Sequence, residues 1–322
     1  MEKIDLKDRK ILYELDINSR QTLTQIGKKV GLPKTVVAYR INRLQEKSII
    51  KNFYTVIDVY KLGYIMMRFQ YRYQYTTSKL EKEIINYFVN KTNSTLVAST
   101  QGMFNLKVVN IIKDINDFYN IWQESQKKYG HYFQDKSSAL FIEEMYYAPS
   151  YLLFENYDRE RREKITLIGR EKRVDIDDLD FKILKIISLN ARMQITDIAK
   201  KLNCTTRTVN YKLKKLSQLG VIKGFRVDID ISRLGYHIFR VHIFLRDYNQ
   251  RNKVINYIKY NSNLVFIDTY TGDADLEIEF HLENMNQLYE IMQNIIEKFP
   301  NAIRDYKHLN IIKYHKFLYL PE

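Results

Sequence analysis

The spacing of apolar residues along the chain changes between the period of a helix and the period of a strand. In residues 6–18, 23–30 and 35–47, apolar side chains recur every three or four positions, which places them on one face of a helix. Thr22 or Thr24 can cap the second segment, and Gly31 can end it in a left-handed conformation. Two short helices joined by a tight turn form a helix-turn-helix. Residues 1–53 therefore predict a winged-type helix-turn-helix DNA-binding domain.

The next residues alternate with a period of two. Phe69 and Tyr71 alternate with Arg68 and Gln70, a pattern that predicts a strand with one buried face. A helix at 79–90, strands at 95–101 and 105–112, a helix at 115–129 and a strand at 138–147 are expected to follow. This βαββαβ order is typical of a ferredoxin-like domain, here over residues 54–149.

The whole pattern occurs twice. A shift of 172 residues places Asp8 on Asp180 and Tyr64 on Tyr236, with no gap between them. In the second copy Asn203 replaces the turn glycine, and asparagine also tolerates the left-handed conformation. We expect a second helix-turn-helix over residues 175–226 and a second ferredoxin-like domain over 227–322. Residues 150–174, which include the charged run 159–164, are interpreted as a linker that is helical in part. The fold class is thus α+β, with two winged-type helix-turn-helix modules alternating with two ferredoxin-like effector or dimerisation domains.

Within the second ferredoxin-like domain, the strand 275–282 shows the clearest alternation. Leu276, Ile278 and Phe280 form an apolar set, and Glu277, Glu279 and His281 form a polar set. The pattern predicts one apolar and one polar face.

Charge narrows the choice of partner. The net charge is +14, and it is concentrated in the helical modules: residues 1–53 hold twelve Lys/Arg against six Asp/Glu, and residues 175–226 hold eleven against five. An excess of this kind favours a polyanionic partner, with double-stranded DNA the leading candidate. The single cysteine, Cys204, excludes a disulfide framework. The charged start and the lack of an apolar run of about 18 residues predict a cytoplasmic protein without a membrane partner.

The third helix of each copy carries a basic face opposite its apolar face. On a single helix such a face is more often merely solvated, but its occurrence twice favours DNA recognition. Thr205 is expected to cap the second of these helices. The candidates for reading bases are Thr206, Arg207, Asn210, Tyr211 and Lys214 in the second copy, and Lys34, Thr35, Ala38, Tyr39 and Asn42 in the first. Arg40, Arg43, Lys212 and Lys215 are expected to contact phosphates. Because the two sets differ, we expect two unlike half-sites rather than a palindrome.

These residues carry a resemblance to the Lrp/AsnC (feast/famine) family of transcription regulators. The second copy shows it in Leu179-Asp180, Asn190-Ala191-Arg192 and Leu219-Gly220-Val221-Ile222, and the first copy shows it less completely in Asp8, Asn18 and Arg20. The resemblance implies a sequence-specific DNA-binding transcription regulator in which the helix-turn-helix is paired with a ferredoxin-like effector-binding domain. Members usually carry one copy and dimerise through the sheet domains. A tandem chain is therefore either an intrachain pseudo-dimer or a homo-oligomer that pairs between chains.

The resemblance also implies an effector site. Family members have a glycine followed three residues later by aspartate, at the turn between the central strands, and bind small effectors such as amino acids nearby. Gly272, Asp273 and Asp275 fit this pattern, whereas Gly102 is followed by Asn105 instead of aspartate. The alternative interpretation is a tight hairpin at Gly272 in which Asp275 caps the backbone.

An enzyme must also be considered, because the siroheme decarboxylases, a branch that resembles this family, share the two-lobed layout. Such a tetrapyrrole enzyme would depend on the histidines of the sheet domains, namely His131, His237, His242, His281, His308 and His315. His237 and His242 are five apart and face opposite sides of a strand, so they cannot jointly bind a metal. Each histidine is expected to be exposed or satisfied by hydrogen bonds. The expected function is regulation, with no catalytic residues, no metal and no cofactor.

Overall fold

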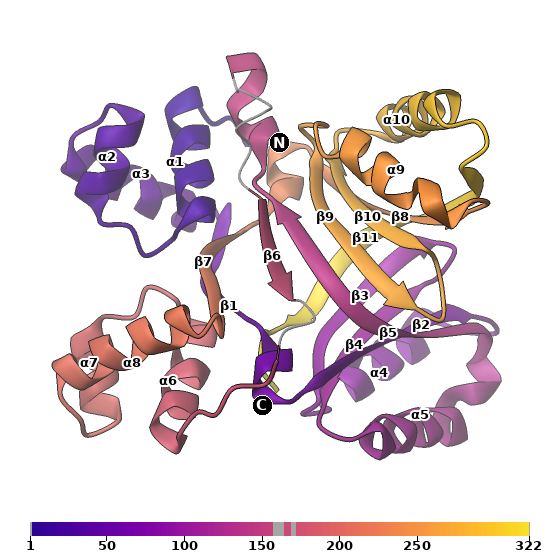
Figure 1. Ribbon diagram of the computed structural model, residues 1–322, viewed down its shortest axis with the longest axis horizontal. Helices are drawn as coiled ribbons and strands as arrows, with labels where there is room; N and C mark the ends of the chain where they lie inside the picture. Colours follow the sequence, from indigo (N-terminus) through magenta and orange to yellow (C-terminus); the bar gives the residue numbers. More distant parts are fainter. Residues whose placement is uncertain (1, 157–163, 169–171, 322) are drawn as a thin grey trace.

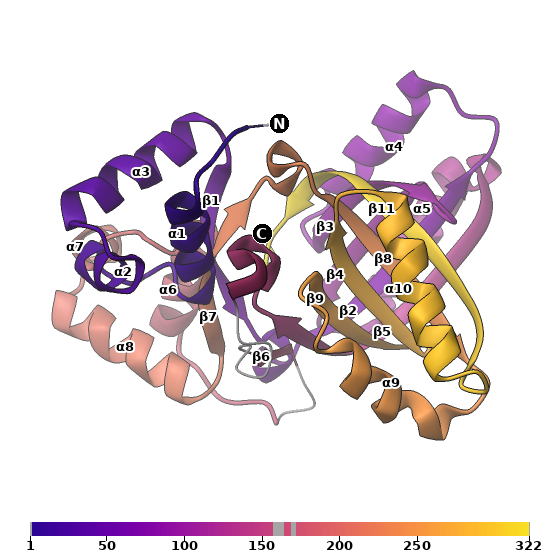
Figure 2. The same cartoon turned by 90° about the horizontal axis from the view of Figure 1, so that it is seen from above.

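A computed structural model describes residues 2–156, 164–168 and 172–321. The molecule has two helical units at one end and, at the other, one sheet that closes on itself, called the ring below (Figures 1 and 2). Helices cover the outside of the ring. The predicted α+β class, with two helix-turn-helix modules and two ferredoxin-like domains, is confirmed. Among the described residues, no helix combines the length and the apolar content that a membrane crossing requires.

The two helical units have the same three-helix plan. The first contains α1 (Leu6–Ile17), α2 (Leu23–Val30) and α3 (Lys34–Glu46), and the second contains α6 (Asp178–Leu189), α7 (Ile195–Lys201) and α8 (Thr206–Gln218). Thr22 caps α2, and the turns use left-handed residues where the sequence predicts them: Gly31 at φ 67° and Asn203 at φ 50°. The substitution of asparagine for glycine therefore leaves the turn unchanged.

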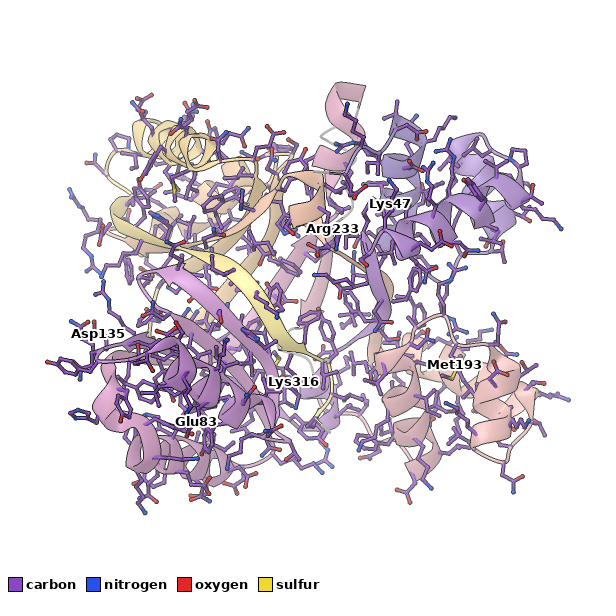
Figure 3. All side chains as sticks on the ribbon, turned by 180° about the vertical axis from the view of Figure 1, so that it is seen from behind. Lys47, Glu83, Asp135, Met193, Arg233 and Lys316 are labelled. Carbon is purple, nitrogen blue, oxygen red and sulfur yellow. The ribbon has the colours of Figure 1, made fainter. Side chains whose placement is uncertain are left out.

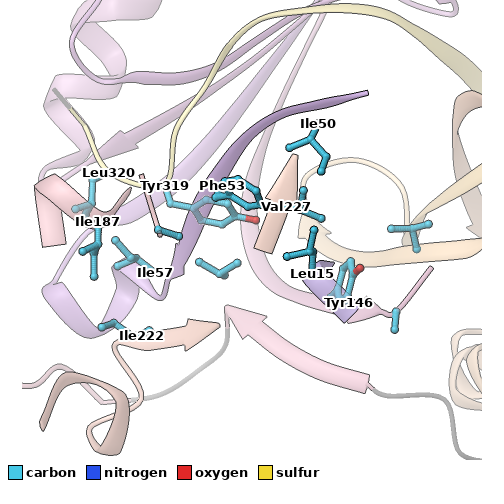
Figure 4. Packing of buried hydrophobic residues seen from close by; sticks show 14 of the residues in the cluster. Leu15, Ile50, Phe53, Ile57, Tyr146, Ile187, Ile222, Val227, Tyr319 and Leu320 are labelled. Carbon is cyan, nitrogen blue, oxygen red and sulfur yellow. The ribbon is translucent and has the colours of Figure 1, made fainter. Parts of the chain in front are cut away.

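A two-stranded sheet joins the helical units. Strand β1 (Ile50–Ile57) pairs antiparallel with β7 (Ile222–Ile229), and helices from both units pack on it (Figure 4). Phe53 and Val227 are partners in this pairing and are both buried. The predicted domain boundaries at 53/54 and 226/227 fall inside these strands, because each strand completes a helical unit and also pairs with the other copy.

Each ferredoxin-like half has the βαββαβ order that the sequence predicts. The first contains β2 (Ile65–Tyr73), α4 (Ser78–Val89), β3 (Ser94–Gly102), β4 (Leu106–Ile112), α5 (Ile115–Tyr129) and β5 (Phe133–Tyr147). The second contains β8 (His237–Leu245), α9 (Arg251–Ile258), β9 (Leu264–Thr271), β10 (Leu276–Leu282), α10 (Met285–Lys298) and β11 (Ile303–Phe317).

The long last strand of each half closes the ring. Strand β5 pairs with β2 of its own half and, from Leu140 to Tyr146, with β9 of the other half. Strand β11 likewise pairs with β8 and then, from Leu309 to Phe317, with β3. The order β2-β4-β3-β11-β8-β10-β9-β5 returns to β2, and β6 (Lys164–Ile168) is added beside β5. In this structure the two halves are therefore paired within one chain.

Closure of the ring overturns one expectation about its strands. The alternating strands were expected to have one buried face, but the polar set is buried as well: Arg68, Gln70 and Glu277 are inaccessible to solvent. Their apolar neighbours, such as Phe69 and Phe280, pack outward under the helices. The polar residues point to the inside of the closed ring, where strands of the two halves face each other. The alternation separated the two faces of each strand correctly. The polar face is nevertheless buried, because charged and polar side chains line the inside of the ring.

The linker contains more regular structure than expected. Its start forms a 3₁₀ helix at Ser150–Asn156, and residues 164–168 form strand β6. The charged run 159–163 lies outside the described residues. Further on, the Val174 N–H donates to the carbonyl of Lys61 at 2.9 Å, which holds this part of the linker against the first half.

Candidate nucleic-acid interface

Helix α8 presents the exposed basic face that its sequence predicts. The Thr205 hydroxyl accepts the backbone N–H of Thr208 at 3.1 Å, so Thr205 is its N-terminal cap. Val209 and Leu216 are buried beneath the helix. On the outer side, the five predicted base-reading residues are all exposed: Thr206, Arg207, Asn210, Tyr211 and Lys214. The side chains proposed to read bases are therefore free of the core.

Helix α3 presents a matching face with different chemistry. Val37 and Leu44 are buried, whereas Lys34, Thr35, Tyr39 and Asn42 are exposed. Tyr39 and Tyr211 occupy equivalent positions, and each is 65% exposed. A large aromatic side chain that remains this open at both positions is expected of a contact surface rather than of a core.

The four predicted phosphate contacts have partners inside the protein. Arg40 Nη1 lies 2.8 Å from Asp8, and Arg43 Nη2 lies 2.5 Å from the same carboxylate. In the second unit Lys212 pairs with Asp177, and Lys215 lies 2.9 Å from Asp180. Asp8 and Asp180 also belong to the capping boxes of α1 and α6. These cations therefore hold the third helix of each unit against the first, a role that the helical spacing alone does not reveal. Their contact with phosphate stays a prediction.

Matched arginines hold the two helical units together. Arg20 Nη1 donates to the carbonyl of Ala191 at 2.5 Å, and its guanidinium lies 5.4 Å from the ring centroid of Phe225. Arg192 repeats these contacts in reverse, at 2.6 Å to the carbonyl of Ser19 and 5.2 Å from Phe53. Burial lowers the pKa of both guanidinium groups. The reciprocal contacts fix the orientation of one unit relative to the other.

A buried ion pair ties the helical units to the ring. Arg226 on β7 lies 3.0 Å from Asp16 of α1, Tyr146 of β5 donates its hydroxyl to the same carboxylate, and the Arg226 guanidinium lies 3.5 Å from the Tyr146 ring centroid. Burial raises the pKa of Asp16 against the opposing charge of Arg226. The first copy has Tyr54 where the second has Arg226, so this connection exists once and breaks the symmetry of the repeat.

The turns expected to bind an effector have structural partners. The Asp275 carboxylate accepts the backbone N–H of Leu245 at 2.7 Å, and Asn105 accepts that of Tyr73 at 2.9 Å. Both side chains therefore cap the end of a first strand, a task that an amide oxygen performs as well as a carboxylate. Asp273 is bound by Arg68 and by Ser137. Asp275 thus has a capping role, although it caps the end of β8 and not the hairpin at Gly272 as the alternative interpretation expected. Effector binding at this turn stays a prediction.

The glycines of these turns lie where the two halves meet. A Cβ on Gly102, at φ 129°, would lie 2.6 Å from the carbonyl oxygen of His308 on β11. A Cβ on Gly272, at φ 95°, would lie 3.3 Å from the carbonyl oxygen of Ser138 on β5. Glycine is needed at these positions because a strand of the other half passes close to the backbone.

The helical units and the ring occupy opposite ends of the molecule. Lys47 and Met193 mark the two helical units in Figure 3, and Glu83 and Asp135 mark the far end of the ring. Helices α3 and α8 therefore lie at the same end of the molecule.

Both helical units match known families. Residues 4–45 match the AsnC-type helix-turn-helix domain, and residues 176–223 match a winged helix-turn-helix DNA-binding family. An uncharacterized HTH-type transcriptional regulator of Pyrococcus furiosus is 31% identical over 123 residues, which cover 37% of this chain and 79% of that protein. Regulatory protein AsnC of Haemophilus influenzae is 27% identical over 124 residues, 38% of this chain and 83% of that protein. Each relative thus corresponds to less than one half of this chain.

The fold as a whole also has a solved counterpart. The crystal structure of the siroheme decarboxylase NirDL covers 98% of this chain with 94% of its own length, at a TM-score of 0.65 and 14% sequence identity. At that identity the similarity is one of fold. The sequence relatives and the matched helix-turn-helix domains decide the family, and the chain belongs to the Lrp/AsnC family of helix-turn-helix transcription regulators, with the family unit present twice.

Proposed function

We propose that the chain is a sequence-specific DNA-binding transcription regulator in which one polypeptide supplies both of the recognition helices that two subunits supply in a dimeric regulator. The observation that carries the proposal is the fixed pairing of two exposed recognition helices, α3 and α8, through β1, β7 and the reciprocal Arg20 and Arg192 contacts. In dimeric helix-turn-helix proteins, the two recognition helices enter major grooves about one turn of DNA apart.

Helices α3 and α8 carry different side chains at the positions proposed to contact bases. Asn210 can make a bidentate contact with adenine and Arg207 one with guanine, whereas the first copy has Ala38 where the second has Asn210. The proposed target therefore contains two different half-sites at a fixed spacing. The net positive charge of both helical units supplies the electrostatic part of the affinity, which salt weakens.

Substitution of Arg207 tests this reading face. Arg207→Ala is expected to lose about 1–3 kcal/mol of binding at the preferred site and to relax the choice of base in one half-site only. The measurement is a gel-shift titration against the preferred DNA and against variants of each base pair. Arg246→Ala removes the same charge from an exposed position at the end of β8 and serves as the control. Equal affinity and equal base preference in Arg207→Ala and Arg246→Ala would show that α8 does not read the DNA.

A tetrapyrrole enzyme remains the second candidate, since the fold similarity to a siroheme decarboxylase spans nearly the whole chain. His242 lies inside the ring, 3.3 Å from Glu277, and burial lowers its pKa to about 4. The cavity nearby measures about 50 Å³, room for about three to five water molecules, which is far too little for a tetrapyrrole. Titration with siroheme, followed by absorbance, tests this candidate: a stoichiometric spectral shift would favour the enzyme over the regulator.

A further inference from the structure

Three carboxylates lie side by side on neighbouring strands inside the ring. Glu144 on β5 is the direct partner of Asp268 on β9, and Asp268 is the direct partner of Glu277 on β10. Like charges opposite each other on paired strands repel, and burial weakens the screening of that repulsion by solvent. A row of this kind needs cations to balance it.

The cations present balance only one end of the row. Glu277 receives Lys107 Nζ at 2.7 Å and also pairs with Arg68. Burial alone would raise the pKa of Glu277, but the charges of Lys107 and Arg68 hold it well below its ordinary value. Arg240 pairs with Asp268 and is shared with Glu279 at 2.6 Å.

The ring therefore contains more buried acid than base. Five carboxylates interact there, Glu144, Asp268, Asp273, Glu277 and Glu279, against three arginine or lysine cations, Arg68, Lys107 and Arg240. Burial and the charge of Asp268 raise the pKa of Glu144 to about 8, so at neutral pH Glu144 holds a proton and the excess is four charged carboxylates to three cations. His281 lies 2.9 Å from Glu279, at the other end of this group. His242 adds no charge at neutral pH, since burial lowers its pKa to about 4. Among the side chains that the structure describes, none forms an ion pair with Glu144, and Arg240 and Lys107 act on it only through their charge.

That end opens into a cavity of about 50 Å³. Glu144 and Asp268 line the cavity together with Lys107 and Arg240, and apolar side chains make up most of its remaining wall. Glu144 Oε1 and Asp268 Oδ1 have no hydrogen-bond partner among the described residues, although Asp268 is only 1% exposed. Buried carboxylate oxygens are normally satisfied, so these two oxygens are free to accept hydrogen bonds from a donor that enters the cavity.

We propose that this cavity binds a small organic ammonium ion. The ammonium group donates hydrogen bonds to Glu144 and Asp268 and supplies the missing positive charge, and a short alkyl chain contacts the apolar wall of Val109, Ile111 and Phe141. The volume suits an ion of about four non-hydrogen atoms, comparable to the three to five waters it can hold. A metal ion is a poorer fit, because no group of three or more His, Cys, Asp or Glu side chains in the described chain is arranged to hold one.

The cavity also adjoins the strand that leads to the first helical unit. Ile57 at the end of β1 and Val59 just after it form part of the wall. Tyr319, also in the wall, stacks on Tyr54 of β1 with ring centroids 5.5 Å apart. An ion in the cavity therefore touches the β1–β7 sheet that fixes the two recognition helices. The ammonium ion is the effector of this regulator, an assignment that rests on the proposed function.

Calorimetric titration of the full chain with n-propylammonium tests the site, with 1-propanol and propionate as matched probes of the same size. The ammonium ion is expected to bind and the two matched probes to leave the heat signal unchanged. Glu144 holds a proton up to a pKa of about 8, because burial and the charge of Asp268 oppose its ionisation. Binding at pH 7 should therefore release about one proton, seen as a dependence of the heat on buffer ionisation enthalpy.

Two variants separate the site from a general effect of the amine. Glu144→Gln should weaken binding by about tenfold or more and abolish the proton release, since it removes a charge-assisted hydrogen bond. Asp268→Asn should also weaken binding, and Glu46→Gln, an exposed carboxylate on α3, is the control that leaves it unchanged. Equal binding of 1-propanol, or unchanged binding and proton release in Glu144→Gln, would overturn the proposal.

DNA titrations with and without n-propylammonium separate the site from the regulatory function. The amine is expected to change the affinity for the preferred DNA by about fivefold or more, the usual scale of coupling between two sites. Amine binding without any effect on DNA affinity would refute the effector assignment. A chain that binds the amine but no DNA sequence would refute the proposed function and leave the site intact, and DNA binding without amine binding would refute the site alone.

Discussion

Replacement of Glu144 by glutamine should stabilise the chain, by an amount that grows with pH. Burial and the neighbouring charge of Asp268 raise the pKa of Glu144 from an ordinary value of 4.5 to about 8. Between these values the unfolded chain has lost this proton and the folded chain still holds it, so the contribution of Glu144 to stability falls as pH rises. Glutamine keeps the shape of the side chain and never ionises, so Glu144→Gln removes that loss.

The size of the effect follows from the two pKa values. Each pH unit between them costs about 1.4 kcal/mol, which amounts to about 3 kcal/mol at pH 7 and about 5 kcal/mol above pH 8. Near pH 4.5 the variant and the parent should be almost equally stable. Over the same interval the stability difference between variant and parent should rise steadily.

Urea unfolding of both proteins at intervals between pH 5 and pH 8.5 measures this difference. Other groups titrate in the same range, but they are shared by both proteins and cancel in the comparison. Glu46→Gln, which removes an exposed carboxylate, should differ from the parent by no more than about 0.5 kcal/mol at each pH. A Glu144→Gln variant that is less stable than the parent, or whose advantage is the same at every pH, would refute the charge imbalance inside the ring.

Three further predictions concern the joints of the fold. Arg20→Ala and Arg192→Ala should each cost about 2–4 kcal/mol of unfolding free energy, because each removes a charge-assisted hydrogen bond and a cation–π contact, and a loss below about 0.5 kcal/mol would contradict the clamp. Gly102→Ala should lower stability by about 1–3 kcal/mol through its clash with β11, whereas Gly224→Ala, with no atom within 4 Å, is the control, and equal thermal midpoints for the two would argue against the close approach. Asp275→Asn should keep near-normal thermal stability and Asp275→Ala should lose about 1 kcal/mol, an order that an effector carboxylate without a capping role would not give.

The helical units could be predicted closely because their signals are local. The three-and-four spacing, the Thr205 cap and the left-handed Asn203 each depend on a few neighbouring residues. The internal repeat, a shift of 172 residues, then predicts the second helical unit from the first. The first five residues of β5 were missed because most of their side chains are exposed and carry no apolar alternation. Backbone pairing with β2 alone makes them a strand.

The ring and its contents could not be predicted, since they depend on pairing between segments far apart in sequence. The pattern at Arg68 and Glu277 is that of an ordinary half-exposed strand, and only the closure of β5 on β9 and β11 on β3 buries both faces. The same reason explains why the carboxylate partners of Arg40, Arg43, Lys212 and Lys215, the four residues expected to contact phosphates, could not be predicted. Arg40 and Lys212 pair with carboxylates 35 residues earlier in the chain, and a helical wheel does not include such partners.

The central claim is that one chain reads two unlike half-sites held at a fixed distance, and selection of bound duplexes from a random pool tests it most directly. We expect the enriched sequences to contain two different half-sites whose centres are separated by about one helical turn, or a whole multiple of it, at a single spacing. Arg207→Ala should lose base preference in one of them only. A pool without enrichment, a single half-site, or two half-sites at variable spacing would contradict the account.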